Sequence, residues 1–161
     1  MSSSEISKPS VRIWVDADAC PRPIKDLLFR TSQRRNVGLV LVANQTMNAP
    51  DNELIKVITV PHGADKADDR IVSQLNAGDI VVTQDIPLAA RAVELECVAI
   101  GVRGELFDES SIGNRLATRN LMDHLRSAGM ETSGPRAFDS KDLQKFANQL
   151  VRTLTKSLRK N

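Results

Sequence analysis

Aspartates directly follow two apolar runs of the sequence. Asp16 and Asp18 stand one residue apart after VRIWV, and Asp85 ends the segment VVTQD. Carboxylates gathered in one place repel one another and resist the loss of water, and a hard divalent cation is the usual means of holding them together. The spacing therefore predicts a Mg²⁺ or Mn²⁺ site, with Asp16, Asp18 and Asp85 as the candidate catalytic residues.

A third group of aspartates, in the segment HGADKADDRIV, opens a predicted helix that ends at Gly78. Asp68 continues the apolar stripe of this helix, whereas Asp69 lies about 100° further round it. We therefore expect Asp68 to be a metal ligand, with Asp69 as a further candidate and Asp65 as the helix N-cap. Capping alone is the alternative for this group and for Asp85, since carboxylates satisfy the free amides of a first helical turn.

Three other residues are candidates for supporting the site or binding substrate. Arg103 follows the fifth apolar run, where it could neutralise a phosphate or pair with an acid. Cys20 begins a helix, where a thiol can act as a nucleophile, but the neighbouring acids oppose a thiolate and favour simple packing under the turn at Pro21. His62 precedes the acidic loop and could reach the site, although a surface turn is the commoner place for such a histidine.

Five short runs rich in Val and Ile provide the strands that would position these residues. They alternate with helical patterns and are almost continuously apolar, which is typical of strands covered by helices on both faces. The sequence therefore predicts an α/β domain with a mainly parallel sheet, in which the first and fourth strands are neighbours and their acids share one rim. The runs are Val11–Val15, Val37–Ala43, Ile55–Val60, Asp79–Thr83 and Cys97–Val102.

The last third of the chain predicts two more helices, the first of them closed by Gly129. We expect both to pack back on the sheet, because no linker rich in Gly, Pro or Ser divides the chain. The expected organisation is a flexible leader at 1–10, one domain at 11–156 and a basic tail at 157–161. The residues predicted to face inward are Ile112, Leu116, Leu121 and Leu125 in the first helix and Leu143, Phe146, Leu150 and Leu154 in the second.

Composition limits the classes of partner. The chain has 161 residues, a formal net charge of +2 and two cysteines, which fits a cytoplasmic protein with free thiols. No apolar run could cross a bilayer, so no membrane partner is expected. One tryptophan, four phenylalanines and no tyrosine are too few for base-stacking platforms, so RNA would be held through its phosphates. The final helix offers cations for such contacts, or for a merely solvated face: Lys145, Arg152, Lys156, Arg159 and Lys160.

Four segments together resemble the YaiI/YqxD family of small bacterial proteins, also called UPF0178. They are WVDADACP, HGADKADDRIV, GDIVVTQDIPLAARA and VRGELF, and the likeness extends from about Val11 into the final helix. That family is similar in turn to PIN-like and NYN domains. The resemblance implies a PIN-like three-layer α/β/α fold around a five-stranded, mainly parallel sheet of strand order 3-2-1-4-5, with two extra C-terminal helices.

The resemblance also implies a function, because PIN-like nucleases use acids from the first strand, a central helix and the fourth strand to bind Mg²⁺ or Mn²⁺. Here those roles would fall to Asp16, to Asp68 or Asp69, and to Asp85, with Asp18 and Asp65 as supporting residues. We therefore favour a metal-dependent, ribonuclease-like nuclease.

Two other functions compete with this hypothesis. VDADAC matches the Asp-x-Asp signature of haloacid-dehalogenase-like phosphatases, with Asp16 as nucleophile and Asp18 as acid. Against it, Asp79 of the later Gly-Asp pair precedes its strand and would point away from the site. The last alternative is a PIN-like module that binds RNA or protein without catalysis.

Overall fold

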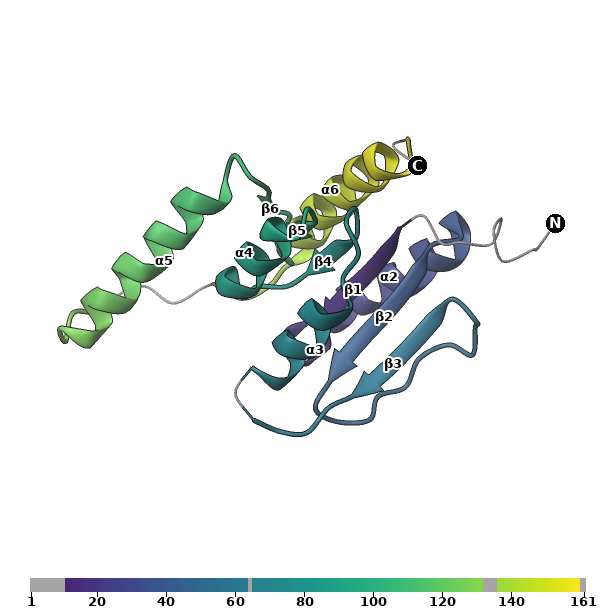
Figure 1. The fold of residues 1–161 in the computed structure, drawn as a ribbon, viewed down its shortest axis with the longest axis horizontal. Coiled ribbons are helices and arrows are strands. Elements are labelled where there is room, and N and C mark those ends of the chain that lie inside the picture. The colour runs from purple at the N-terminus through teal and green to yellow at the C-terminus, as the bar shows by residue number, and fades with distance from the viewer. Residues whose placement is uncertain (1–10, 64, 132–135, 160–161) are drawn as a thin grey trace.

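A single six-stranded sheet organises the computed structural model, which describes residues 11–63, 65–131 and 136–159 (Figure 1). The strand order is β3-β2-β1-β4-β5-β6, so the predicted order 3-2-1-4-5 is confirmed. The predicted leader at 1–10 and the last two residues of the predicted tail lie outside the described residues. The strands are β1 (Arg12–Asp16), β2 (Gly38–Ala43), β3 (Ile55–Thr59), β4 (Ile80–Val82), β5 (Val98–Ile100) and β6 (Leu106–Phe107).

The sequence predicts five strands, and the structure adds the sixth. Strands β1 to β5 pair in parallel, whereas β6 runs antiparallel to β5, with Phe107 opposite Ala99. The hairpin between them turns through Gly104 at a φ of 91°, a conformation that favours glycine. A strand of two residues is too short to show a period in the sequence, which is why the prediction missed it.

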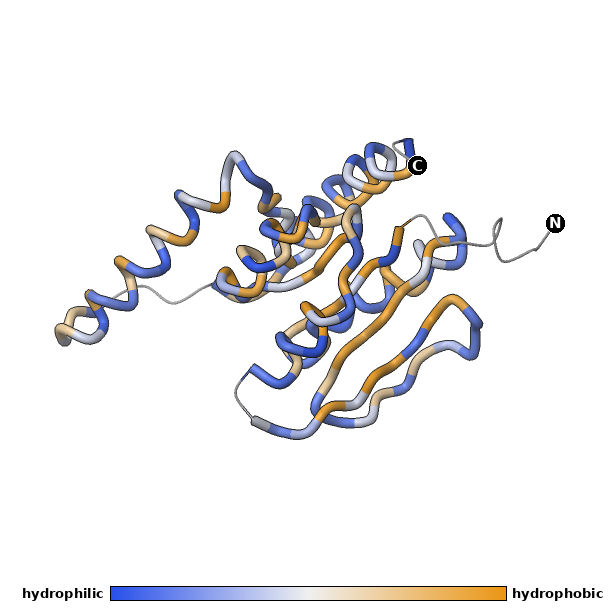
Figure 2. Tube along the Cα trace, in the orientation of Figure 1, coloured by the Kyte–Doolittle hydropathy of each residue, from blue (hydrophilic) through white to orange (hydrophobic). Residues whose placement is uncertain are grey.

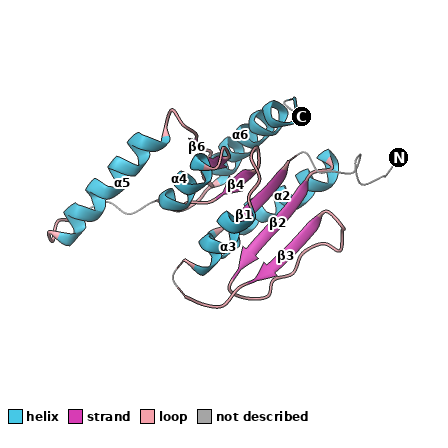
Figure 3. Cartoon of the chain, in the orientation of Figure 1, coloured by secondary structure: helices cyan, strands magenta, loops and turns pink. Residues whose placement is uncertain are grey.

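Helices cover both faces of the sheet and complete the three layers (Figures 1 and 3). Helices α2 (Arg22–Arg35) and α6 (Ser140–Arg159) pack on one face, and α3 (Lys66–Gln74) and α4 (Ile86–Glu94) pack on the other. A short 3-10 helix, η1 (Ala17–Ala19), joins β1 to α2. Among the described residues, none of the helices combines the length and apolar character that crossing a bilayer requires.

The central strands are buried on both faces, as their almost continuous apolar character predicts. In β1, Ile13 and Val15 belong to the cluster beneath α2 and α6, whereas Trp14 between them belongs to the cluster beneath α3 and α4. The hydropathy colouring shows the same pattern (Figure 2). Apolar residues run along β1 and β2, whereas polar and apolar residues alternate along each helix. The acids at the strand ends are therefore carried by the buried core of the sheet.

The two C-terminal helices behave differently. Phe146, Leu150 and Leu154 of α6 are buried against the sheet, as predicted. Helix α5 (Ile112–Ser127) has no buried residue, and Leu121 is 56% exposed. The start of α5 packs against α4, with Ile112 half-buried against the cluster beneath α3 and α4, but the rest of the helix does not pack back on the sheet as expected. The reason lies in the spacing of its apolar residues. Ile112 and Leu116 lie on one side of the helix, and Leu121 and Leu125 lie roughly 180° further round, so the four form no continuous stripe.

Two helix ends also differ from the prediction. Helix α3 stops at Gln74 rather than at Gly78, because Leu75 already has extended backbone. The Arg12 guanidinium donates to the Gln74 carbonyl (3.1 Å), which satisfies an acceptor at this helix end. Helix α6 continues to Arg159, inside the stretch 157–161 that the sequence suggested as a tail.

A buried carboxylate at the amino end of β4 fixes this strand against β1. Asp79 is 2% exposed, and its Oδ1 accepts a hydrogen bond from the Arg12 backbone N–H (3.1 Å). Its Oδ2 accepts from the Trp14 indole N–H (3.1 Å) and from the Asn76 backbone N–H (3.0 Å). The Arg12 guanidinium lies 3.8 Å from the same oxygen and 4.8 Å from the centre of the Trp14 ring. As predicted, Asp79 points away from the carboxyl ends of the strands.

Replacing Asp79 with alanine is expected to lower the free energy of unfolding by about 3 kcal/mol, because it leaves the buried indole and backbone N–H groups without an acceptor. Urea unfolding followed by far-UV circular dichroism would measure the change. Glu94→Ala, at an exposed position of α4, is the control and should change it by less than about 0.5 kcal/mol. A loss below about 1 kcal/mol for Asp79→Ala would show that these hydrogen bonds do not hold the two strands together.

Candidate functional site

The carboxyl ends of β1 and β4 lie side by side, and this pairing brings Asp16 and Asp85 to one place. The two strands pair in parallel up to Val15 opposite Val82. Thr83, which follows β4, is buried, and its hydroxyl donates to Asp16 Oδ2 (3.1 Å) while accepting from the Asp85 backbone N–H (3.0 Å). One buried hydroxyl therefore connects the two acids. In the sequence this threonine stands within TQD, where no pattern predicted a role for it.

Asp85 also caps the following helix. Its Oδ1 accepts a hydrogen bond from the Leu88 backbone N–H (3.0 Å), so the capping alternative is confirmed for this residue. The cap occupies one carboxylate oxygen, and no residue in the described part of the chain donates to the other. Capping therefore holds the Asp85 carboxylate in a fixed orientation and leaves it an oxygen for a ligand.

The third acid comes from the other side of the strand ends. Asp68 is half-buried in the first turn of α3. Loss of water, followed by the negative charges of Asp85, Asp16 and Asp65, raises the pKa of Asp68 to about 6, while Arg91 opposes the rise. Two strand ends and one helix thus place three carboxylates within electrostatic range of one another. We call Asp16, Asp68 and Asp85 the acidic rim.

Asp16 is strained electrostatically in the same way. Burial raises its pKa above the ordinary value, the hydrogen bond from Thr83 opposes the rise, and the charges of Asp85 and Asp18 add to it. The rim is therefore a place where negative charge is held at a cost in free energy, and such places are enriched in functional sites.

Asn44, directly after β2, carries a buried oxygen without a partner. Its Oδ1 accepts no hydrogen bond from any described residue. Its backbone N–H donates to Asp18 Oδ2 (2.8 Å), so the exposed Asp18 joins the end of β2 to η1. A buried acceptor without a donor is rare and is usually satisfied by water, a ligand or an ion. Asn44 was not among the predicted site residues, although a polar residue directly after VLVA was an available signal.

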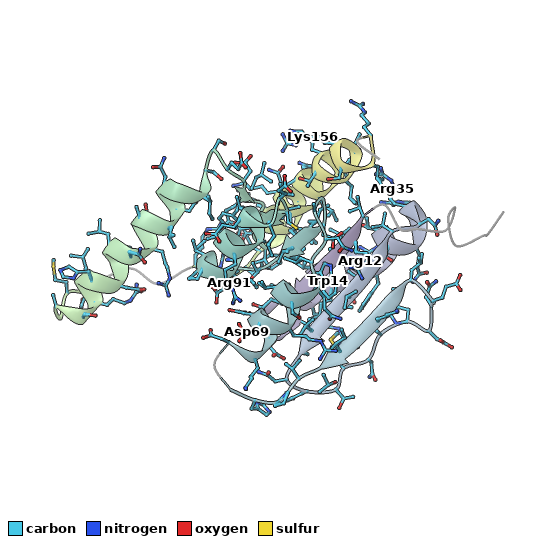
Figure 4. The ribbon with its side chains drawn as sticks, in the orientation of Figure 1. Arg12, Trp14, Arg35, Asp69, Arg91 and Lys156 are labelled. Atoms are coloured by element: carbon cyan, nitrogen blue, oxygen red, sulfur yellow. The ribbon has the colours of Figure 1, made fainter. Side chains whose placement is uncertain are left out.

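The remaining acids lie apart from the rim. Asp69 pairs with Arg91 across α3 and α4, with 3.0 Å between Oδ1 and Nη1 (Figure 4). Its position about 100° from Asp68 thus turns it toward a cation rather than toward the other acids. Asp65 occupies the predicted N-cap position of α3, but its backbone is left-handed and its exposed side chain makes no capping hydrogen bond. Asp65 contributes only its charge to Asp68.

Cys20 and His62 show no sign of a chemical role. Cys20 is buried, and its thiol lies 3.7 Å from the Pro21 carbonyl. Burial raises its pKa to about 12, Lys25 opposes the rise and Asp16 adds to it, so its surroundings disfavour a thiolate and agree with simple packing. His62 is exposed in the loop before α3 and makes no polar contact with the described residues.

Arg103 is engaged with an acid, one of the two roles that the sequence left open. Its guanidinium pairs with Asp142 Oδ2 at 2.8 Å, and Arg136 holds the same carboxylate at 2.6 and 2.7 Å. Arg103 also hydrogen-bonds the Arg136 carbonyl. Asp142 is fully buried, and the hydrogen bonds from Arg136 hold its pKa well below its usual range. This cluster fastens the start of α6 to the segment after β5.

The oxygen ligands of the acidic rim suit a hard divalent cation, but the carboxylates lie too far apart to coordinate one together. Mg²⁺ and Mn²⁺ prefer carboxylate and amide oxygens, which the rim and Asn44 supply. Within the ranges 11–63, 65–131 and 136–159, no three His, Cys, Asp or Glu side chains are grouped closely enough to hold a metal ion as they stand. Closing the carboxylates around an ion would require their side chains to turn toward it.

Comparison with known proteins agrees with the motifs. Residues 14–156 match the family model described as "Uncharacterized BCR, YaiI/YqxD family". A UPF0178 protein of Maridesulfovibrio salexigens is 53% identical over 92% of this chain and 98% of its own length. UPF0178 proteins of Dechloromonas aromatica and Xanthomonas campestris pv. campestris are 50% and 49% identical, over 91% and 90% of this chain and 97% and 91% of their own lengths. No solved structure matches the chain.

Replacing Asp68 with asparagine should stabilise the protein by about 1 kcal/mol at pH 7 in a chelating buffer, after allowance for solvent screening. Because the folded-state pKa is raised from 3.8 to about 6, the folded chain binds the Asp68 proton more tightly than the unfolded chain does. Stability is therefore lost as the pH rises through this window, and the variant escapes that loss. Chemical unfolding at pH 7 and pH 4 would measure the difference, which should be much smaller at pH 4, close to the unfolded-state pKa of 3.8.

Asp69→Asn is the matched control for this experiment. It removes one charge from the neighbouring residue and breaks only an exposed ion pair, so we expect a change within about 0.5 kcal/mol at both pH values. An Asp68→Asn effect of the same size at pH 4 as at pH 7 would mean that charge repulsion at the rim is not its cause.

Proposed function

The chain belongs to the YaiI/YqxD (UPF0178) family, and we propose that it is a PIN-like, metal-dependent nuclease that hydrolyses phosphodiester bonds, RNA being the expected substrate. The convergence of Asp16, Asp68 and Asp85 carries the proposal, because the charges of Asp85 and Asp16 both raise the pKa of Asp68. The three acids come from the end of β1, the start of α3 and the turn after β4. That is the distribution that the resemblance to PIN-like nucleases implies.

The residues of the rim have separable tasks in this proposal. Thr83 and the helix cap hold Asp16 and Asp85 in fixed orientations, so these two would be the preformed ligands. Asp68 would turn toward them and complete the set, with Asn44 Oδ1 as a further oxygen donor. A bound Mg²⁺ or Mn²⁺ would polarise the scissile phosphate and lower the pKa of an attacking water. Negative charge that destabilises the free protein would then be neutralised by the ion.

The alternatives receive less support. In the phosphatase hypothesis, the Gly-Asp pair should stand near Asp16, yet Asp79 lies at the opposite end of β4 and is hydrogen-bonded to Arg12 and Trp14. A PIN-like module that binds RNA or protein without catalysis remains as an outcome of the test. Cys20 and Cys97 are free thiols, which supports the cytoplasm as the place where the protein works.

Metal binding is testable by thermal and chemical unfolding. Mn²⁺ at a hundred times its Kd should raise the free energy of unfolding of the wild type by about 2.7 kcal/mol. Asp16→Asn and Asp68→Asn should respond far less, since each removes a charged ligand. Asp69→Asn should respond like the wild type, and this comparison decides between the two adjacent aspartates. A wild type that Mn²⁺ does not stabilise would remove the metal from the proposal.

Activity is testable on labelled single-stranded RNA and DNA. Cleavage should require Mg²⁺ or Mn²⁺ and stop with EDTA, and Asp16→Asn or Asp85→Asn should reduce its rate about 100-fold or more. Asparagine is itself a good N-cap, so Asp85→Asn keeps the α4 cap and separates catalysis from folding. Binding of RNA without cleavage by the wild type in either metal would identify the non-catalytic module instead.

A further inference from the structure

Basic side chains gather at the amino ends of the strands, which form the edge of the sheet opposite the acidic rim. Helix α2 connects the parallel strands β1 and β2, so it runs back from the rim and ends at this opposite edge. Helix α6 starts at the Asp142 cluster beside the end of β5 and ends at the same edge (Figure 1). The last turn of α2 carries Arg34 and Arg35, and that of α6 carries Lys156 and Arg159. We call these four residues the basic edge.

The cations of the basic edge have no acidic partners. Arg34, Lys156 and Arg159 are exposed and Arg35 is half-exposed. Among the described residues, none of the four forms an ion pair with an acid. The two helices bring no acid to this end, because each carries its single aspartate in its first half. Figure 4 shows Arg35 and Lys156 at the end of the molecule away from the Asp69–Arg91 pair.

The charge also exceeds what the helix ends require. A helix macrodipole amounts to about half an elementary negative charge at its C-terminus, which a single cation already balances. Each of these two helices instead ends in two cations. The excess is concentrated on helices that pack on the same face of the sheet. The exposed acids Asp51 and Glu53 precede β3 at this end, but neither forms an ion pair with the four cations. Clustered cations that are not ion-paired are the usual footprint of a surface that meets a polyanion.

We propose that the basic edge binds the phosphate backbone of a nucleic acid. Three of its four cations are arginines, whose planar guanidinium groups match phosphate oxygens in a bidentate manner. The chain has one tryptophan, four phenylalanines and no tyrosine, too few for a base-stacking platform, so the contact would hold phosphates without reading bases.

The inference deepens the proposed function, and its catalytic consequence rests on that function. Helix α2 spans the molecule from the rim to the basic edge, and its 14 residues measure about 21 Å. A strand that rises about 3.4 Å per nucleotide needs roughly six nucleotides to cover that distance. The substrate would therefore be a polynucleotide anchored at one edge and cut at the other, and a dinucleotide would miss the anchor.

Binding is tested without metal, so that it does not depend on catalysis. A labelled 20-nucleotide single-stranded RNA is titrated in EDTA at several salt concentrations. Arg35→Gln/Lys156→Gln should weaken binding about tenfold and flatten the salt slope by about 1.4, which corresponds to two lost phosphate contacts. Lys141→Gln/Lys145→Gln removes the same charge from exposed positions at the opposite end of α6 and should change affinity less than about twofold. Equal losses in both variants would overturn the proposal.

Two further measurements distinguish nucleic-acid binding from the two other roles that such cations can have. If the cations only stabilise the helix ends, Arg35→Gln/Lys156→Gln will lower the melting temperature and leave RNA affinity unchanged. If they meet a membrane surface, the wild type will bind phosphatidylserine vesicles and not RNA. Either result would overturn the proposal, which expects an unchanged or higher melting temperature and RNA binding that vesicles do not match.

Turnover separates this proposal from the proposed function. The basic-edge variant should lose cleavage of the 20-nucleotide RNA in proportion to its loss of affinity, with cleavage of a dinucleotide unchanged. Equal loss on both substrates would contradict the anchoring role. A wild type that binds the long RNA through the basic edge but cleaves neither substrate would contradict the nuclease proposal alone.

Discussion

The hydrogen bonds of buried Asp79 hold β1 against β4, and the geometry of the acidic rim depends on that pairing. Asp79 binds β1 at one end of β4, and the Thr83 hydroxyl binds Asp16 at the other. Only the three residues of β4 separate these two contacts. A shift of one residue between the strands would turn their side chains to the wrong faces and separate Thr83 from Asp16. The same register thus determines the core and the candidate site.

At the rim, one residue combines a helix cap with a carboxylate oxygen that the cap leaves free. Asp85 caps α4 with one oxygen, and the alternatives of capping and ligand binding, which the sequence set against each other, are compatible. Repulsion and burial nevertheless raise the pKa of Asp16 and of Asp68. A chain selected for stability alone would have no use for this arrangement, so the strain is itself a reason to look for a ligand there.

The sequence predicted those features that follow from strand periodicity and parallel topology. Continuous apolar runs identified the five main strands, and the rule that parallel strands end at one rim placed Asp16 and Asp85 together. What it missed depends on single tertiary contacts: the buried oxygen of Asn44, the role of Thr83 and the pairing of Arg91 with Asp69. No periodic pattern reveals a partner that lies far away along the chain. The exposure of α5 follows from the angular positions of its apolar residues, which form no single stripe along the helix.

The placement of Trp14 decides what optical probes can see in this protein. It is the single tryptophan of the chain, and its indole is joined to Asp79 beneath the Arg12 guanidinium. Its fluorescence therefore reports on the junction of β1 and β4. Helix α5, which buries none of its residues, could open and close locally without disturbing that signal. Amide hydrogen exchange would resolve such a subglobal opening, and a fluorescence melting curve would describe the sheet alone.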